Sequence, residues 1–106
     1  METNHQLNEI YTLGIWIVKP EKGKAFINEW TLFAKWSAKN VSGIGKGYLL
    51  QDNNNSLRFM SFGTWDNESV IQNWRNSIEF KNFITVAKDL CDDFQPNTLT
   101  VVSTSD

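Results

Sequence analysis

Cysteine and histidine are nearly missing from this chain of 106 residues, and their scarcity excludes several kinds of site. Cys91 is the only cysteine, so no internal disulfide can form and a disulfide-stabilised secreted scaffold is excluded. A zinc site needs about four ligands, whereas Cys91 and His5 stand at opposite ends of the chain. A histidine-activated nucleophile would depend on His5, which lies in a polar N-terminal stretch. We therefore expect no metal site and no catalytic triad.

Net charge and long apolar runs are scarce as well. Ten Lys and Arg against 12 Asp and Glu give a formal charge of −2 without a basic cluster, which argues against nucleic acid as a partner. No apolar run approaches the roughly 20 residues of a membrane span, so we expect no membrane partner. The N-terminus has neither the basic start nor the apolar stretch of a signal peptide, and we expect a cytoplasmic protein.

Aromatic residues, by contrast, are plentiful, with five Trp and seven Phe. A chain of about this length fits a single domain with its own core. The first nine residues are mostly polar and predict a flexible tail over 1–9. The remaining residues, 10–106, contain no linker or internal repeat, and we expect them to form one domain.

Local patterns predict four strands and three helices. Residues 10–18 combine β-branched and aromatic side chains, as strands do. Pro20 suits the first position of a helix, and Asp66 and Ser77 suit helix N-caps. An apolar stripe with helical spacing continues over 80–94. The expected elements are a strand over 10–18, a helix over 20–38, strands over 44–51 and 57–65, a short helix after Asp66, a longer helix after Ser77 and a strand over 98–103.

This order of elements, β-α-β-β-α-β with a divided second helix, predicts a ferredoxin-like fold of the α+β class. In such folds the helices cover one face of an antiparallel sheet. The strand over 10–18 carries large apolar residues on both of its faces, so the face without helices also needs a cover. We expect that open face to pack against a second copy of the chain.

Three segments carry a resemblance to a known family. They are Trp-Ile-Val-Lys-Pro-Glu-Lys-Gly at 16–23, Phe-Gly-Thr-Trp at 62–65 and Trp-Arg-Asn-Ser-Ile-Glu-Phe at 74–80. The most specific feature is the spacing of Trp65, Trp74, Ser77 and Phe80. Together the segments resemble the antibiotic biosynthesis monooxygenase domain family, and the resemblance covers almost the whole chain.

The resemblance implies a dimeric α/β barrel, in which two ferredoxin-like protomers form a homodimer through their open sheet faces. It also implies a pocket within each protomer, between the sheet and its helices. Family members with known chemistry oxidise polycyclic aromatic substrates, quinols or haem, many of them without flavin or metal. We therefore expect a cofactor-independent monooxygenase that uses O2 to oxidise a small aromatic or quinol-like substrate.

Two alternatives to this function stay open. A non-catalytic dimeric domain that binds a small molecule, or acts in a stress response, would keep the same pocket. The haem-degrading branch of the family adds an Asn and a His that would fall near Gly14 and Ile84 of this chain. Gly14 has no side chain and Ile84 cannot ligate iron, so the resemblance disfavours haem degradation.

No residue stands out as catalytic, but several suit the lining of a pocket for a small aromatic ligand. Trp65 matches a family residue that lines the pocket, and it also suits a core aromatic that seals the strand–helix corner. Trp16 suits either the pocket or the dimer interface, and Tyr48 and Ser61 are polar side chains carried by strands. The candidate pocket residues are Trp65, Trp16, Tyr48, Ser61, Trp30 and Phe83.

Two arginines and the cysteine have mainly structural interpretations. Arg58 suits a solvated or ion-paired strand residue, with an interface salt bridge or an anion contact as the alternative. Arg75 stands at the end of the short helix, where a cation suits the helix dipole. Cys91 falls on the apolar stripe, and we expect an inert core thiol.

Overall fold

The computed structural model describes residues 7–106, which form a four-stranded antiparallel sheet and three helices. Residues 1–6 of the predicted tail, His5 among them, lie outside the described residues. The strand order across the sheet is β2-β3-β1-β4. The elements are β1 (Ile10–Val18), α1 (Gly23–Asn40), β2 (Ile44–Asp52), β3 (Asn55–Trp65), α2 (Glu68–Arg75), α3 (Ile78–Leu90) and β4 (Cys91–Thr100).

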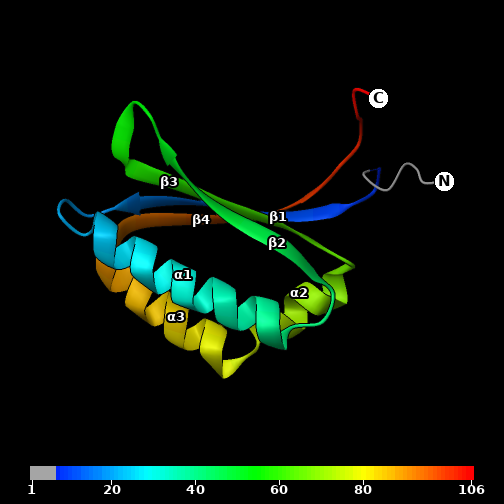
Figure 1. The fold of residues 1–106 in the computed structure, drawn as a ribbon, viewed down its shortest axis with the longest axis horizontal. Helices are drawn as coiled ribbons and strands as arrows, with labels where there is room; N and C mark the ends of the chain where they lie inside the picture. The colour runs from blue at the N-terminus through cyan, green and yellow to red at the C-terminus, as the bar shows by residue number, and fades with distance from the viewer. Residues whose placement is uncertain (1–6) are drawn as a thin grey trace.

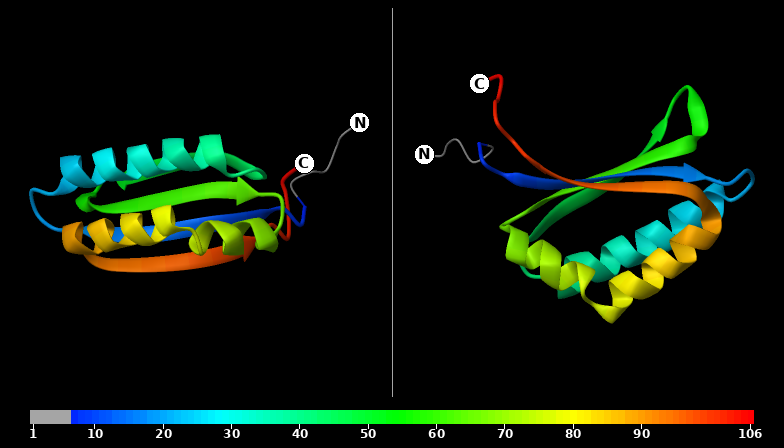
Figure 2. Two further views of the ribbon diagram at one scale, coloured as in Figure 1. Left: turned by 90° about the horizontal axis from the view of Figure 1, so that it is seen from below. Right: turned by 180° about the vertical axis from the view of Figure 1, so that it is seen from behind.

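All three helices lie on the same side of the sheet, and no helix of residues 7–106 covers the other side (Figure 1). Figure 2 shows α1 and α3 running next to each other along the strands, with α2 beyond the start of α3. This arrangement confirms the predicted α+β, ferredoxin-like fold. No helix among residues 7–106 is both long and apolar enough to cross a membrane.

The register of β1, between β3 and β4, decides which side chains face the helices. Trp16 pairs with Phe59 on β3 and with Phe94 on β4, and all three rings pack in the core. Because successive side chains of a strand point to opposite faces, Thr12 and Gly14 share the helix-covered face with Trp16. That face therefore carries both the core and the smaller side chains beside it.

The aromatic residues form the layer between the sheet and the helices. Phe33 of α1 stacks on Phe83 of α3, with ring centroids 4.7 Å apart. Trp16 of β1 stacks on Phe94 of β4 at 3.8 Å. Phe26 of α1 is completely buried beneath them. Much of the aromatic content of the sequence thus serves one continuous core.

Helix α1 begins later than the sequence predicts. Pro20 is the predicted first residue, but α1 begins at Gly23. Residues 19–22 form a turn, closed by a 3.1 Å backbone hydrogen bond between the first and last of them. Glu21 in this turn has a φ of 69°, which a right-handed helix excludes. The prediction is wrong because Pro suits a turn as well as it suits a helix start.

Of the two predicted helix N-caps, one is confirmed and the other is wrong. The side chain of Ser77 accepts a hydrogen bond from the Phe80 N–H at 3.1 Å, as predicted for the start of α3. Asn67, and not Asp66, caps α2 by accepting from the Val70 N–H at 3.2 Å. Asp and Asn cap helices about equally well, so the residue types alone could not show which of these two neighbours is the cap.

The last strand is longer than predicted and begins earlier. Helix α3 ends at Leu90, and Cys91–Thr100 pairs along β1 as β4. The predicted helical stripe as far as Phe94 and the predicted strand over 98–103 are therefore wrong. Pro96 lies inside β4 because this is an edge strand, whose outer side needs no N–H donor.

The end of the predicted tail joins the sheet. Asn8 donates its backbone N–H to the Val101 carbonyl at 3.0 Å, and the Val101 N–H donates to the Glu9 carbonyl at 2.9 Å. These two bonds extend the pairing of β1 and β4 beyond the bounds of either strand. The ordered domain thus begins before residue 10.

Candidate functional site

Two adjoining cavities lie between the helix-covered face of the sheet and the helices, with volumes of about 60 and about 90 Å³. Each has room for several water molecules. Pockets for drug-sized ligands measure about 300–1,000 Å³, so a polycyclic ligand has to displace lining side chains or extend out of the open side. The residues shared by both linings are Thr12, Trp30, Phe33, Ser61 and Trp74.

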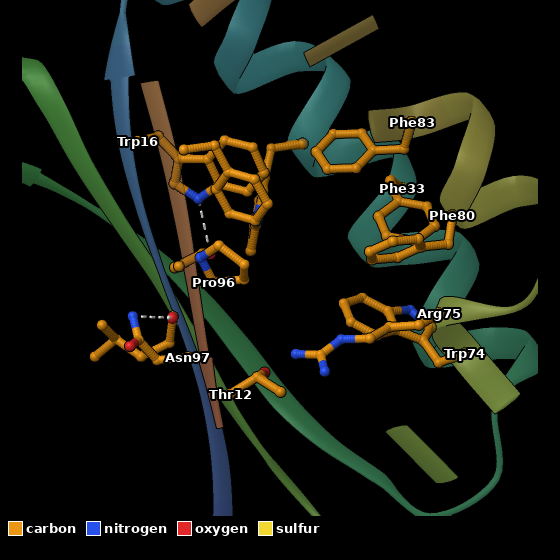
Figure 3. A pocket seen from close by; sticks show the side chains of 14 residues that line it. Thr12, Trp16, Phe33, Trp74, Arg75, Phe80, Phe83, Pro96 and Asn97 are labelled. Atoms are coloured by element: carbon orange, nitrogen blue, oxygen red, sulfur yellow. Dashed lines mark hydrogen bonds between the residues drawn. The ribbon is translucent and has the colours of Figure 1, made fainter. Parts of the chain in front are cut away.

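Aromatic rings form most of the wall of the first cavity (Figure 3). Trp16 and Phe94 come from the sheet, and Phe80 and Phe83 come from α3. Phe33 of α1 lies between these helical rings, nearly parallel to Phe83. Flat apolar walls of this kind suit a planar aromatic ligand.

The second cavity is lined by Trp65 and by the glycines Gly45, Gly47 and Gly63 of β2 and β3. A Cβ added at Gly47 would lie 3.9 Å from the Trp30 ring of α1, so this glycine leaves space beneath that helix. Trp65 lies against Trp74 of α2, with ring centroids 4.7 Å apart. Trp65 is only 5% exposed, so it is both a core residue and a pocket wall, as the two sequence interpretations allowed.

Two indole N–H groups in the cavity walls each donate to a hydroxyl oxygen that lines both cavities. Trp16 donates to Ser61 at 3.0 Å and Trp65 donates to Thr12 at 2.9 Å. Each hydroxyl accepts one hydrogen bond and keeps its own proton, for which residues 7–106 show no acceptor. A hydrogen bond received at the oxygen also strengthens the hydroxyl as a donor. Both hydroxyls lie in the linings of both cavities and can serve an acceptor atom of a ligand.

Space beside these hydroxyls depends on a glycine. A Cβ added at Gly14 would lie 2.9 Å from the Ser61 oxygen and 3.0 Å from both Phe94 and the Trp16 indole nitrogen. An asparagine at this position would therefore collide with the walls of the first cavity. Ile84, the other position compared with the haem-degrading branch, packs against the core and lies in neither lining.

Among residues 7–106, Arg75 is the only charged residue in the two linings. Figure 3 shows its side chain extending from α2 across the first cavity toward the strands. One guanidinium nitrogen lies 3.4 Å from the Thr98 hydroxyl oxygen on β4. No Asp, Glu or His of the described residues lines either cavity, and their lining groups are apolar, hydroxyl, amide and one cation.

Five of the six predicted pocket residues are brought together by the fold: Trp65, Trp16, Ser61, Trp30 and Phe83 each line at least one of the cavities. Tyr48 does not lie with them. It pairs with Phe62 on the other face of the sheet, where the two rings stack at 5.2 Å and the tyrosine is 44% exposed. Because Phe62 and Ser61 are consecutive, their side chains point to opposite faces of the sheet. Tyr48 pairs with Phe62 and therefore lies on the face opposite Ser61.

Sequence reasoning missed four polar residues of the site, which are Thr12, Ser37, Arg75 and Asn97. Thr12 has the same parity as Trp16 on β1, and this pattern could have placed it beside the pocket. Arg75 had no such signal, because its position depends on how α2 packs against the sheet. The pocket residues Phe94 and Pro96 were missed because β4 was predicted to start too late.

The remaining polar features lie outside the cavities. Arg58 forms an ion pair with Asp52 at 3.1 Å near the β2–β3 turn, which fits the ion-paired interpretation. The backbone N–H of Asn54, followed by Arg58, holds the pKa of the Asp52 carboxyl below its usual range. Burial raises the pKa of the Cys91 thiol to about 11, in keeping with an inert core thiol. Among residues 7–106, no three His, Cys, Asp or Glu side chains group as a metal site needs.

The fold and its aromatic cavity define a class of small ferredoxin-like domains with a pocket between sheet and helices. The family model for antibiotic biosynthesis monooxygenase matches residues 13–86 of this chain, which is well over half of it. The chain therefore belongs to the antibiotic biosynthesis monooxygenase family. No curated protein matches the sequence significantly.

Solved structures share this fold at low sequence identity. SnoaB, a cofactor-independent oxygenase from Streptomyces nogalater, is 14% identical with a TM-score of 0.84, covering 92% of this chain and 97% of its own. A Pseudomonas aeruginosa protein is 17% identical with a TM-score of 0.78, covering 94% and 100%. A conserved Methanosarcina mazei protein is 19% identical with a TM-score of 0.80, covering 89% and 93%. At these identities the likeness establishes the fold alone.

Proposed function

We propose that the protein is a monooxygenase that oxidises a small aromatic or quinol-like molecule with O2 in the cavities between sheet and helices. The observation that carries the proposal is the composition of their walls. Flat aromatic rings line the cavities together with the hydroxyls of Thr12 and Ser61, and residues 7–106 place no carboxylate in either lining. Membership of the antibiotic biosynthesis monooxygenase family supports the same reaction class.

The substrate supplies the reactive electrons in this proposal. A phenol, quinol or anthrone that has lost a proton carries its negative charge on oxygen and can pass one electron to O2. The hydroxyl protons of Thr12 and Ser61 would stabilise that oxyanion, and the apolar walls would strengthen these hydrogen bonds by excluding water. With an anthrone, recombination of the two radicals forms a C–O bond to a peroxide. Loss of water then leaves the quinone, so one oxygen atom stays in the product and the other leaves as water.

Oxygen uptake tests the proposal. An oxygen electrode should record consumption of one O2 per molecule of anthrone or hydroquinone oxidised, above the rate without protein. Ser61→Ala removes one of the two donors and should lower kcat by about tenfold or more. Ser69→Ala, an exposed position on α2, is the matched control and should keep the rate. Uptake that is absent for every substrate, or identical in both variants, would contradict the proposed reaction.

A second candidate function is favoured by the linings that residues 7–106 provide. Within this part of the chain no Asp, Glu or His lines either cavity, so it places no ordinary general base beside a bound ligand. A non-catalytic domain that binds a small aromatic molecule would need no base. Quenching of tryptophan fluorescence by such molecules, together with no oxygen uptake, would identify this alternative.

We also propose that the protein forms a homodimer through the open face of the sheet. Apolar side chains cover this face, and Tyr48, Leu50 and Leu99 are 44%, 50% and 46% exposed. A broad apolar hollow extends over the same face. A second copy would bury these side chains, which favours association. Sedimentation should give about twice the monomer mass of 12.2 kDa, whereas a stable monomer at micromolar concentration would contradict the dimer.

A further inference from the structure

Arg75 occupies a position that its own helix does not explain. It is the last residue of α2, where a cation can interact with the carbonyls at the helix end. Two of those carbonyls already have donors. The Gln72 carbonyl accepts from the Asn76 N–H at 3.0 Å, and the Trp74 carbonyl accepts from the Ser77 hydroxyl at 2.7 Å. The guanidinium instead extends into the first cavity (Figure 3).

The guanidinium has hydrogen-bonding capacity left over. An arginine side chain has five N–H donors, and the only acceptor recorded for Arg75 within residues 7–106 is the Thr98 hydroxyl at 3.4 Å. That distance lies beyond the usual range of an N–H···O bond. No carboxylate within residues 7–106 lies within 4 Å of it. A half-buried cation beside Trp74 and Phe80 is therefore open to an anionic ligand.

We propose that Arg75 binds a carboxylate carried by the aromatic ligand of the cavity, and this inference rests on the proposed function. The planar fork of a guanidinium matches a carboxylate with two parallel hydrogen bonds. The surrounding walls are mostly apolar, and residues 7–106 add no acidic side chain to them, so no described carboxylate in the lining opposes the field of Arg75 inside the cavity. A single cation suits a planar group with one negative charge. The ligand class is thus an aromatic or quinol-like carboxylic acid.

This arrangement assigns separate tasks to Arg75 and Ser61. Arg75 would hold the carboxylate beside Thr98, which pairs with Thr12, and the ring would lie against Phe33 and Trp74. The hydroxyl of Ser61, which pairs with Gly14 two residues further along β1, would then meet the ring oxygen. Arg75 is in this view a specificity-determining residue, because it selects the ligand without touching the reacting oxygen.

Equilibrium binding of already oxidised probes tests the inference without any turnover. Anthraquinone-2-carboxylate and anthraquinone-2-carboxamide share one ring system and differ in charge, and tryptophan fluorescence reports the binding of either. The wild type should prefer the carboxylate by about tenfold or more. Arg75→Gln should abolish that preference, with most of the loss in the binding of the carboxylate. Lys81→Gln, an exposed position on α3 with the same change of charge, should retain the preference.

The outcomes separate this inference from the proposed function. Equal binding of both probes by the wild type overturns the role of Arg75, and this result needs no variant that folds. A preference for the carboxylate that persists in Arg75→Gln also overturns it. A carboxylate preference lost in Arg75→Gln supports the inference even if no anthrone or hydroquinone is ever oxidised, in which case only the proposed function fails. Arg75→Lys, which keeps the charge but loses the planar fork, should bind the carboxylate with intermediate strength.

Discussion

Removing the Thr12 hydroxyl should destabilise the protein, because a buried indole would lose its acceptor. Trp65 is 5% exposed and donates its N–H to the Thr12 oxygen at 2.9 Å. Valine at position 12 keeps the shape of threonine but accepts no hydrogen bond. A buried donor left without a partner costs about 1–3 kcal/mol, so the free energy of unfolding should fall by about that amount in Thr12→Val.

Urea unfolding followed by circular dichroism measures this cost. With a slope of about 1–3 kcal/mol per molar urea, the midpoint should shift by on the order of 1 M. All samples need one protein concentration, since dimerisation would couple stability to concentration. Thr64→Val is the matched control, because within residues 7–106 the Thr64 hydroxyl has no hydrogen-bond partner, and its effect should stay within about 0.5 kcal/mol.

A double-mutant cycle shows whether the hydrogen bond causes the effect. Phenylalanine at position 65 has no N–H, so Thr12→Val should cost far less in a Trp65→Phe background than in the wild type. If Thr12→Val destabilises both backgrounds equally, the bond between Trp65 and Thr12 does not hold the cavity wall. Equal destabilisation by Thr64→Val would refute the reasoning in the same way.

Three further predictions concern the packing, a helix cap and the cysteine. Gly14→Ala places a Cβ 2.9 Å from the Ser61 oxygen and should lower the free energy of unfolding in urea by about 1–3 kcal/mol; an unchanged midpoint would contradict the packing. Asn67→Ala removes the cap of α2 and should cost about 1 kcal/mol in thermal unfolding, with helix content at low temperature retained. The pKa of the Cys91 thiol in the folded state, about 11, lies above the ordinary 9.0. The folded state therefore holds the thiol proton to a higher pH than the unfolded state does, and the stability that this difference contributes is lost as the pH rises from 9 to 11. Cys91→Ala should lose less stability over that interval, and identical curves for variant and wild type would exclude the burial effect.

Most of the fold could be predicted because the apolar patterns of the individual strands and helices fit the element order of a ferredoxin-like fold. The two-sided apolar pattern of β1 predicted its bounds correctly, and Ser77 signalled the start of α3. The wrong predictions fall where one residue type suits two structures. Pro20 was interpreted as a helix start, yet it lies in a turn, and the apolar stripe that continued to Phe94 was interpreted as helical, yet its end lies in an edge strand.

The site was less predictable than the fold because it depends on contacts between distant elements. Parity along a strand places Ser61 and Trp65 on one face, and it could have added Thr12. No local pattern shows that Arg75 reaches the cavity, since this requires the packing of α2 against β4. Tyr48 failed to join the site because its register with Phe62, unknown from the sequence, directs it to the open face.

The central claim is that this cavity supports monooxygenation, and turnover of an anthrone under ¹⁸O2 tests it most directly. Mass spectrometry of the quinone should find one ¹⁸O atom per molecule, with the rate reduced in Ser61→Ala and retained in Ser69→Ala. Product oxygen that comes from water, or quinone that forms equally fast without the protein, would contradict the claim.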